Sequence, residues 1–98
     1  MKVFISQPMS GRTDEEILIK RNEIVNKLKE EYGEVEILDS FFTDFNPDVK
    51  PLEYLAKSIG YLAKADLAYF AKGWQDTRGC RIEHICAIEY GIQTVEEI

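Results

Sequence analysis

Near the end of the chain, the segment "DTRGCRIEHICAIEYG" (76–91) carries a glycine and a glutamate at a spacing that suits a reactive site. Gly79 precedes Glu83 by four residues, which is about one turn of the helix that this segment predicts. The positive end of the helix dipole favours an ionised carboxylate there. Such a carboxylate can attack an electrophilic carbon or stabilise a sugar cation. In the alternative interpretation, Glu83 only stabilises the start of its helix.

A second group of polar residues follows the apolar run "KVFIS" (2–6). The segment "SQPMSGR" (6–12) brings the hydroxyls of Ser6 and Ser10 and the guanidinium of Arg12 just ahead of a predicted helix. Hydroxyl, backbone N–H and guanidinium donors together can bind a phosphate or a carboxylate. The segment is neither a P-loop nor a GxGxxG motif. The alternative interpretation is a turn with a solvated Arg12 and a serine cap.

Other candidate residues have equally plain structural interpretations. Trp74 and Tyr61 can stack on a base, although single aromatic residues more often pack in a core. Cys80 and His84 are four residues apart, but the sequence offers no second Cys/His pair to complete a zinc site. We therefore expect no metal and no cofactor. Cys80 and Cys86 are separated by about 600° of helical rotation, so we expect no disulfide between them.

The elements that must position these residues alternate between strands and helices. Strands are predicted at 2–6, 35–38, 66–71 and within 93–98, and helices from Thr13 or Asp14 to near Gly33, at 52–65 and at 80–91. This alternation predicts one domain over residues 1–98, a small doubly wound α/β domain of Rossmann or flavodoxin-like type. Its mostly parallel sheet of four to five strands would be flanked by helices. Ligands bind at the carboxyl ends of such strands, which points to the loops 7–12, 39–50 and 72–79.

The composition limits the partners of this domain. The 98 residues are 45% hydrophobic and 11% aromatic, which suits a folded globular domain. The formal net charge of −6, from 18 acidic and 12 basic residues, argues against nucleic-acid binding but not against one small anionic ligand. No apolar run approaches the roughly 20 residues that span a bilayer, and no signal peptide is evident. We expect a cytoplasmic protein with no membrane partner.

The loop "DSFFTDFNPDVKP" (39–51) is rich in aromatic residues. Phe41, Phe42 and Phe45 would form a docking site for another protein if they were exposed together. Alternatively, they cover the predicted pocket as a lid or pack against the sheet.

Three segments together resemble the nucleoside 2-deoxyribosyltransferase-like superfamily, and in particular its short phage and bacterial branch. They occur in the family's order and are "VFISQPMSG", "IGYLAKADLAYFA" and "GCRIEHICAIEYGIQTV". The family's last motif has Gly, Glu, Ala and Gly at intervals of four residues, which here are Gly79, Glu83, Ala87 and Gly91. The sequence departs from the family's pattern at Ile85, where a small residue is common, and in one extra residue between Asp76 and Gly79.

The resemblance implies an activity. Family members are doubly wound α/β proteins that cleave or exchange the N-glycosidic bond of 2-deoxynucleosides, and some hydrolyse deoxynucleoside 5'-monophosphates. By this resemblance Glu83 is the nucleophile, and Asp66 assists proton transfer to the departing base or orients the site. The expected substrate-binding residues are Ser6, Gln7, Pro8 and Met9 near the base, Ser10, Gly11 and Arg12 near a 5'-phosphate, and Trp74, Asp76 and Gly79. Relatives are oligomeric, so we expect a homo-oligomer.

The function predicted from the sequence is therefore N-glycosidic bond cleavage or transfer on a 2-deoxynucleoside or its 5'-monophosphate. The alternative is a non-catalytic nucleotide-binding protein that keeps the same pocket. In both cases the partner is a small molecule.

Overall fold

The structure of the protein is a computed structural model that describes residues 1–38 and 48–98, so Phe41, Phe42 and Phe45 of the aromatic loop lie outside the described residues. Strands and helices alternate as predicted. They are β1 (Lys2–Ser6), α1 (Asp14–Tyr32), β2 (Glu36–Leu38), α2 (Pro51–Leu62), β3 (Leu67–Phe70), the 3-10 turn η1 (Trp74–Asp76), α3 (Arg78–Glu89) and β4 (Gln93–Glu96).

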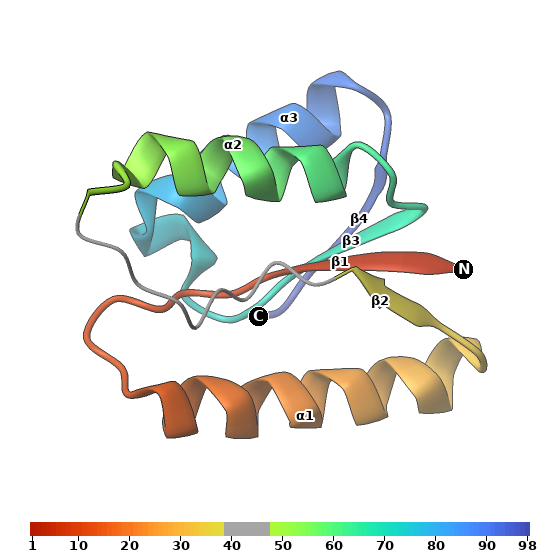
Figure 1. The fold of residues 1–98 in the computed structure, drawn as a ribbon. Helices are drawn as coiled ribbons and strands as arrows, with labels where there is room; N and C mark the ends of the chain where they lie inside the picture. Colours follow the sequence, from red (N-terminus) through yellow and green to blue (C-terminus); the bar gives the residue numbers. More distant parts are fainter. Residues whose placement is uncertain (39–47) are drawn as a thin grey trace.

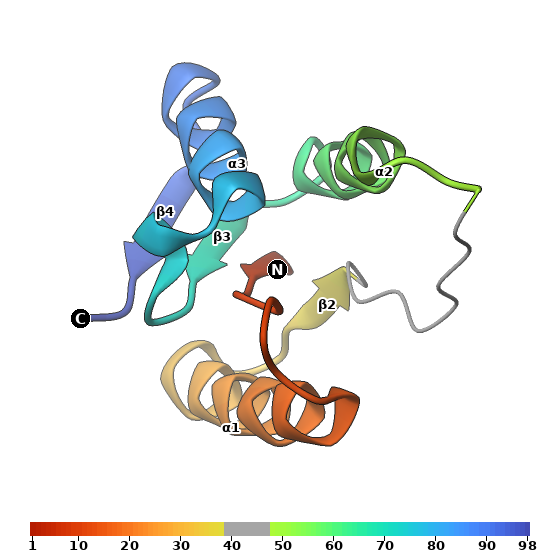
Figure 2. The ribbon, with the colours of Figure 1, turned by 90° about the vertical axis from the view of Figure 1, so that its left-hand side faces the viewer.

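The strands form a parallel sheet in the order β2-β1-β3-β4. Helix α1 covers one face of this sheet, and α2 and α3 cover the other (Figures 1 and 2). This confirms the predicted doubly wound α/β fold, whose strand order is that of flavodoxin-like domains. Because every strand runs in the same direction, the loops after β1 and β3 leave the sheet at one edge. The candidate site is at this carboxyl edge.

Side chains along β1 alternate between the two faces of the sheet, because successive residues of a strand point in opposite directions. Val3 and Ile5 belong to the core on the α1 side, with Ile24, Leu28, Leu67, Tyr69 and Ala71. Phe4 belongs to the core on the α2 and α3 side, with Leu62, Ala68, Phe70 and Ala87. Ser6 lies two residues after Phe4 and therefore faces α3. The last residue of β1 thus presents a hydroxyl to the helix that carries Glu83.

Helix α3 turns a buried row of side chains toward the sheet. Cys80, Glu83 and Ala87 are its buried residues, at spacings of three and four that place them on one face. Glu83 therefore occupies a position that a core residue would normally take. A glutamate there loses most of its contact with water.

Helix α2 begins one residue earlier and ends three residues earlier than predicted. Leu52, its second residue, is 72% exposed, whereas Ser58 and Leu62 are buried. Ten residues separate Leu52 from Leu62, which rotates Leu52 about 80° away from the inward direction. Ser58 lies only four residues before Leu62 and faces inward instead. In the described ranges, none of the helices is long and apolar enough to cross a membrane.

Candidate functional site

A hollow of about 220 Å³ opens at the carboxyl edge of the sheet. The end of β1 and its loop form one wall, α2 forms a second, and the start of α3 forms the third. The lining residues are Ile5, Ser6, Gln7, Met9 and Ser10 from the first wall, Pro51, Tyr54, Leu55 and Ser58 from α2, and Thr77, Gly79, Cys80 and Glu83 from the third. The expected residues Ser6, Gln7, Met9, Ser10, Gly79 and Glu83 thus come together.

The carboxyl group of Glu83 is held by a serine. The Oγ of Ser6 donates a hydrogen bond of 2.6 Å to Oε1 of Glu83, across 77 positions of sequence. Glu83 is 8% exposed and Ser6 is 2% exposed. Burial raises the pKa of Glu83 to about 7, although the hydroxyl of Ser6 acts in the opposite direction. Burial therefore outweighs the hydrogen bond from Ser6, so Glu83 is less ionised than the helix dipole alone leads us to expect.

Cys80 lies beside this pair on the first turn of α3. Burial raises the pKa of its thiol to about 11; Ser6 acts to lower it and the negative charge of Glu83 acts to raise it. The thiol is therefore protonated at neutral pH, which makes it a poor nucleophile. Glu83 is the reactive group that the arrangement favours.

A second hollow of about 450 Å³ lies on the α1 side of the same loop. Its lining residues are Gln7, Pro8, Arg12, Glu16, Lys20, Ala71, Lys72 and Gly73, so it shares Gln7 with the first hollow. The Nη1 of Arg12 donates a hydrogen bond of 2.7 Å to the carbonyl oxygen of Pro8. Ser10 and Arg12, expected at one phosphate, thus line different hollows. Gly11, which has φ +76°, links them and lines neither.

Gln7 separates the two hollows. Its side chain is on the α1 face, where Nε2 donates a hydrogen bond of 2.8 Å to the carbonyl oxygen of Ile17. The residue is 6% exposed, and its Oε1 is buried without a hydrogen-bond partner among the described residues. The bond to α1 fixes the orientation of the amide, and its carbonyl oxygen is shielded from solvent.

The predicted catalytic role of Asp66 is wrong, because this residue lies at the opposite edge of the sheet. Its Oδ2 accepts a hydrogen bond of 2.8 Å from the backbone N–H of Lys2, and its own N–H donates to the carbonyl oxygen of Lys2. Lys2 is the first residue of β1 and Ser6 is the last, about 13 Å apart at the rise of a strand. Asp66 is exposed at the amino ends of the strands and cannot reach a ligand beside Glu83.

Trp74 and Asp76 also lie outside the first hollow. The indole of Trp74 stacks on the imidazole of His84, with 4.1 Å between ring centroids, and also contacts Phe70. Trp74 therefore makes its ring contacts within the protein, with His84 and Phe70. Asp76 is exposed in η1 and lines neither hollow. The structure therefore does not bring Trp74 and Asp76 together with the residues around Glu83.

Residues 1–96 match the family model described as "Domain of unknown function (DUF4406)". The chain belongs to the DUF4406 family. Neither a curated protein nor a solved structure matches it. All residues that line the two hollows fall within the part of the chain that matches DUF4406, so the site is part of the family domain.

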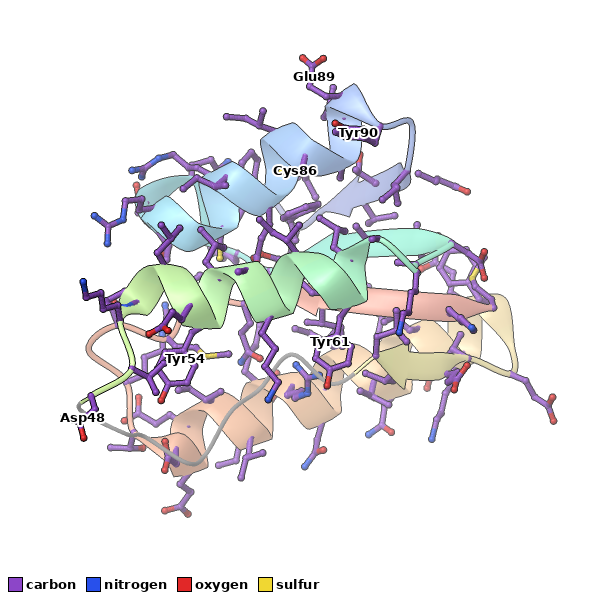
Figure 3. All side chains as sticks on the ribbon, turned by 45° about the horizontal axis from the view of Figure 1, so that its top comes forward. Asp48, Tyr54, Tyr61, Cys86, Glu89 and Tyr90 are labelled. Carbon is purple, nitrogen blue, oxygen red and sulfur yellow. The ribbon has the colours of Figure 1, made fainter. Side chains whose placement is uncertain are left out.

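The sequence analysis did not predict that α2 supplies one wall of the first hollow, which we call the DUF4406 site. Tyr54 and Ser58 line the hollow from this helix, and Tyr54 projects from the same side of α2 as Tyr61 (Figure 3). One signal for Ser58 is present in the sequence, because a serine interrupts the row of Leu55 and Leu62. Thr77 and Cys80 carry no comparable signal. Their place depends on where α3 begins against the sheet.

The DUF4406 site is thus a small, partly apolar hollow with hydroxyl groups on all three walls and a single carboxyl group at Glu83. Among its described lining residues there is no lysine, arginine or histidine. In residues 1–38 and 48–98, no three His, Cys, Asp or Glu side chains are grouped so that they could hold a metal ion. The arrangement suits a neutral, hydroxyl-bearing part of a ligand placed against a carboxylate that is half ionised near neutral pH.

Proposed function

We propose that the protein cleaves or transfers the N-glycosidic bond of a 2-deoxynucleoside or its 5'-monophosphate, with Glu83 as the nucleophile. The observation that carries this proposal is the buried Glu83 carboxyl group at the carboxyl edge of the sheet, with a pKa of about 7. The resemblance of the segments around Gly79 and Glu83 to the nucleoside 2-deoxyribosyltransferase-like superfamily supports it.

The chemistry needs the ionised half of the Glu83 population. An oxygen of the carboxylate bonds to C1' of the sugar as the C1'–N bond breaks. The electron pair of the C1'–N bond leaves with the base, which then takes a proton. Water, in a hydrolase, or a second base, in a transferase, then attacks C1' and frees Glu83. Glu83 is the one carboxyl group among the described lining residues, so it is assigned the nucleophilic role alone.

The lining of the hollow supports a sugar as the part of the substrate that contacts Glu83. Hydroxyl groups from Ser10, Tyr54, Ser58 and Thr77 surround a volume of about 220 Å³. This is below the roughly 300–1,000 Å³ typical of pockets that enclose a whole small molecule. A 5'-phosphate, where the substrate has one, would find cations in the second hollow, at Arg12 and Lys72.

Chromatography of free base tests the proposal. The protein is incubated with 2-deoxynucleosides and their 5'-monophosphates, with and without an acceptor base, beside Glu83→Gln and Asp66→Asn. We expect base release by the wild type and by Asp66→Asn, and a loss of about a thousandfold or more in Glu83→Gln. Release that requires an acceptor base identifies a transferase. Equal release by Glu83→Gln and the wild type would contradict the proposal.

The alternative, a non-catalytic nucleotide-binding protein, is favoured if nothing is released while a nucleotide raises the melting temperature. Glu83→Gln should then keep or improve nucleotide affinity, because a neutral side chain removes the charge that burial disfavours. The same variant thus separates an enzyme from a binding protein.

We also propose that the protein is a homo-oligomer, because α3 carries apolar side chains on its outer surface. Ile85, Ile88 and Tyr90 are 59%, 54% and 86% exposed. Of these, Tyr90 also lines an apolar hollow of about 550 Å³, together with Ile59, Leu62, Ala63, Cys86 and Ile92; Tyr90 and Cys86 are labelled in Figure 3. Burying such a surface in a subunit contact is favourable. Sedimentation equilibrium gives the number of subunits, and a monomer at all concentrations would contradict this.

A further inference from the structure

The contact between Ser6 and Glu83 joins the two elements that meet at the floor of the first hollow. The hydroxyl of Ser6 donates to Oε1 of Glu83 at 2.6 Å, which is a short distance typical of a hydroxyl bonded to a charged acceptor. Ser6 has one hydroxyl proton and donates it to Glu83, and its hydroxyl also interacts with the thiol of Cys80.

Ser6 is a rigid donor. It pairs with Phe70 in the ladder between β1 and β3, and its carbonyl oxygen accepts a hydrogen bond of 2.9 Å from the N–H of Ala71. Its side chain is 2% exposed. The glutamate side chain has three rotatable bonds and gains a preferred orientation from this fixed partner.

The groups around Glu83 leave Ser6 as its main polar contact. From α3, Cys80 is the titratable neighbour, and His84 faces Phe70, Trp74 and Glu96 instead. From α2, Tyr54 is the titratable residue that lines the hollow. From the first loop, Arg12 lowers the pKa of Cys80 and lines the second hollow. Among the described residues, Ser6 is the one side chain whose interaction, in addition to burial, shifts the pKa of Glu83.

We propose that Ser6 is a positioning residue, whose hydroxyl holds Oε1 of Glu83 in place, favours its ionised form and leaves Oε2 as the oxygen that meets a ligand in the hollow. This deepens the proposed function, on which its catalytic consequence rests. The carboxylate then attacks with an oxygen whose direction is set by the end of β1 rather than by the substrate. Without Ser6, Glu83 would lose both its orientation and the donor that stabilises its charge.

A titration of Glu83 without any substrate tests this. The carboxyl carbons of glutamate are labelled with carbon-13, the Glu83 signal is assigned from its loss in Glu83→Gln, and its shift is followed against pH. We expect the inflection to rise by about one pH unit in Ser6→Ala, because a hydrogen bond to the charged form lowers a pKa. Ser6→Cys introduces a side chain of similar volume that is a weak donor, so it should also raise the inflection pH of Glu83. Ser6→Thr keeps a hydroxyl donor, so its inflection should stay at the wild-type pH.

Thr94→Ala is a matched control. The hydroxyl of Thr94 donates a hydrogen bond of 3.0 Å to Oε1 of Glu96, so this variant deletes a comparable donor outside both hollows. The inflection of Glu83 should then stay at its wild-type pH. An unchanged inflection of Glu83 in Ser6→Ala and in Ser6→Cys would overturn the inference.

Turnover supplies the second measurement and separates this inference from the proposed function. If Ser6→Ala moves the inflection and wild type releases no base, the function is wrong and the role of Ser6 stands. If the wild type does release base, kcat/KM of Ser6→Ala should be about fivefold lower at pH 7, because a smaller fraction of Glu83 is ionised. This fivefold loss should disappear at pH 9, where Glu83 is ionised in both proteins. An equal loss at both pH values, with an unmoved inflection, would overturn the role of Ser6 alone.

Discussion

Two glutamates, Glu83 and Glu97, show how differently one domain can treat a carboxyl group. Glu83 lies among core residues and has a single hydroxyl donor, Ser6. Glu97 follows β4 and accepts hydrogen bonds from Lys20 Nζ at 2.7 Å and from the hydroxyl of Tyr69 at 2.6 Å. Burial tends to raise the pKa of both. For Glu83 burial prevails, whereas for Glu97 the lysine and the tyrosine outweigh it and lower the pKa.

The difference follows from the partners and not from burial alone. A full positive charge compensates the lost hydration of a carboxylate, whereas one neutral hydroxyl compensates only part of it. Glu97 thereby ties α1 to the end of the chain after β4, a structural role. Glu83 remains poorly compensated at an open hollow, which is typical of residues that act on a ligand.

The largest effect on stability is expected at Glu83. Between pH 4.5 and about 7 the folded protein binds a proton there that the unfolded chain has released, so stability falls as pH rises through about 7. A pKa raised from 4.5 to about 7 corresponds to about 3 kcal/mol at most. The wild type loses this stability as pH rises from 4.5 to 8, whereas Glu83→Gln does not. The free energy of unfolding of Glu83→Gln relative to the wild type, measured with urea, should therefore rise by about 2 kcal/mol between these two pH values.

Glu89→Gln is the control for this experiment, because Glu89 is an exposed glutamate on the same helix (Figure 3). Its stability should follow that of the wild type at every pH. If the curves of Glu83→Gln and the wild type ran parallel, burial would not be raising the pKa of Glu83.

A smaller effect of opposite sign is expected at Glu97. Tyr69→Phe removes a donor to a charged acceptor and should cost about 1 kcal/mol at pH 7 in the same urea experiment. Because the folded pKa of Glu97 is lowered, its contribution is present above the unfolded pKa and is lost as pH falls through the folded pKa. The cost should thus shrink toward pH 3. An equal cost at both pH values would remove the contrast with Glu83.

The order of the elements and the edge that carries the site could be predicted from the sequence. Buried runs such as 2–6, followed by residues of helical period, require parallel strands with crossover helices, and these bring the loops together. The segment from Gly79 to Glu83 could be placed at that edge for the same reason. The wall formed by α2 could not, because the turn of Ser58 toward the hollow depends on how the helix rotates over the sheet.

Asp66 shows a second kind of limit. The predicted strand 66–71 begins at Asp66 and so already placed this residue at the amino end, away from the ligand edge, whereas its catalytic role came from the resemblance alone. It precedes β3 and so lies at the amino edge, with Lys2. The direction of a parallel strand, once its bounds are known, decides which of its two ends can meet the site.

The sequence by itself determined the doubly wound fold and the location of Glu83 near the ligand edge. Both follow from the hydrophobic period of local segments and from the order of the elements along the chain. Only the tertiary structure decided the raised pKa of Glu83, its partner Ser6 and the separation of Ser10 from Arg12. These depend on distances and solvent exclusion between segments up to 77 positions apart. No local pattern encodes how much water a side chain loses when those segments meet.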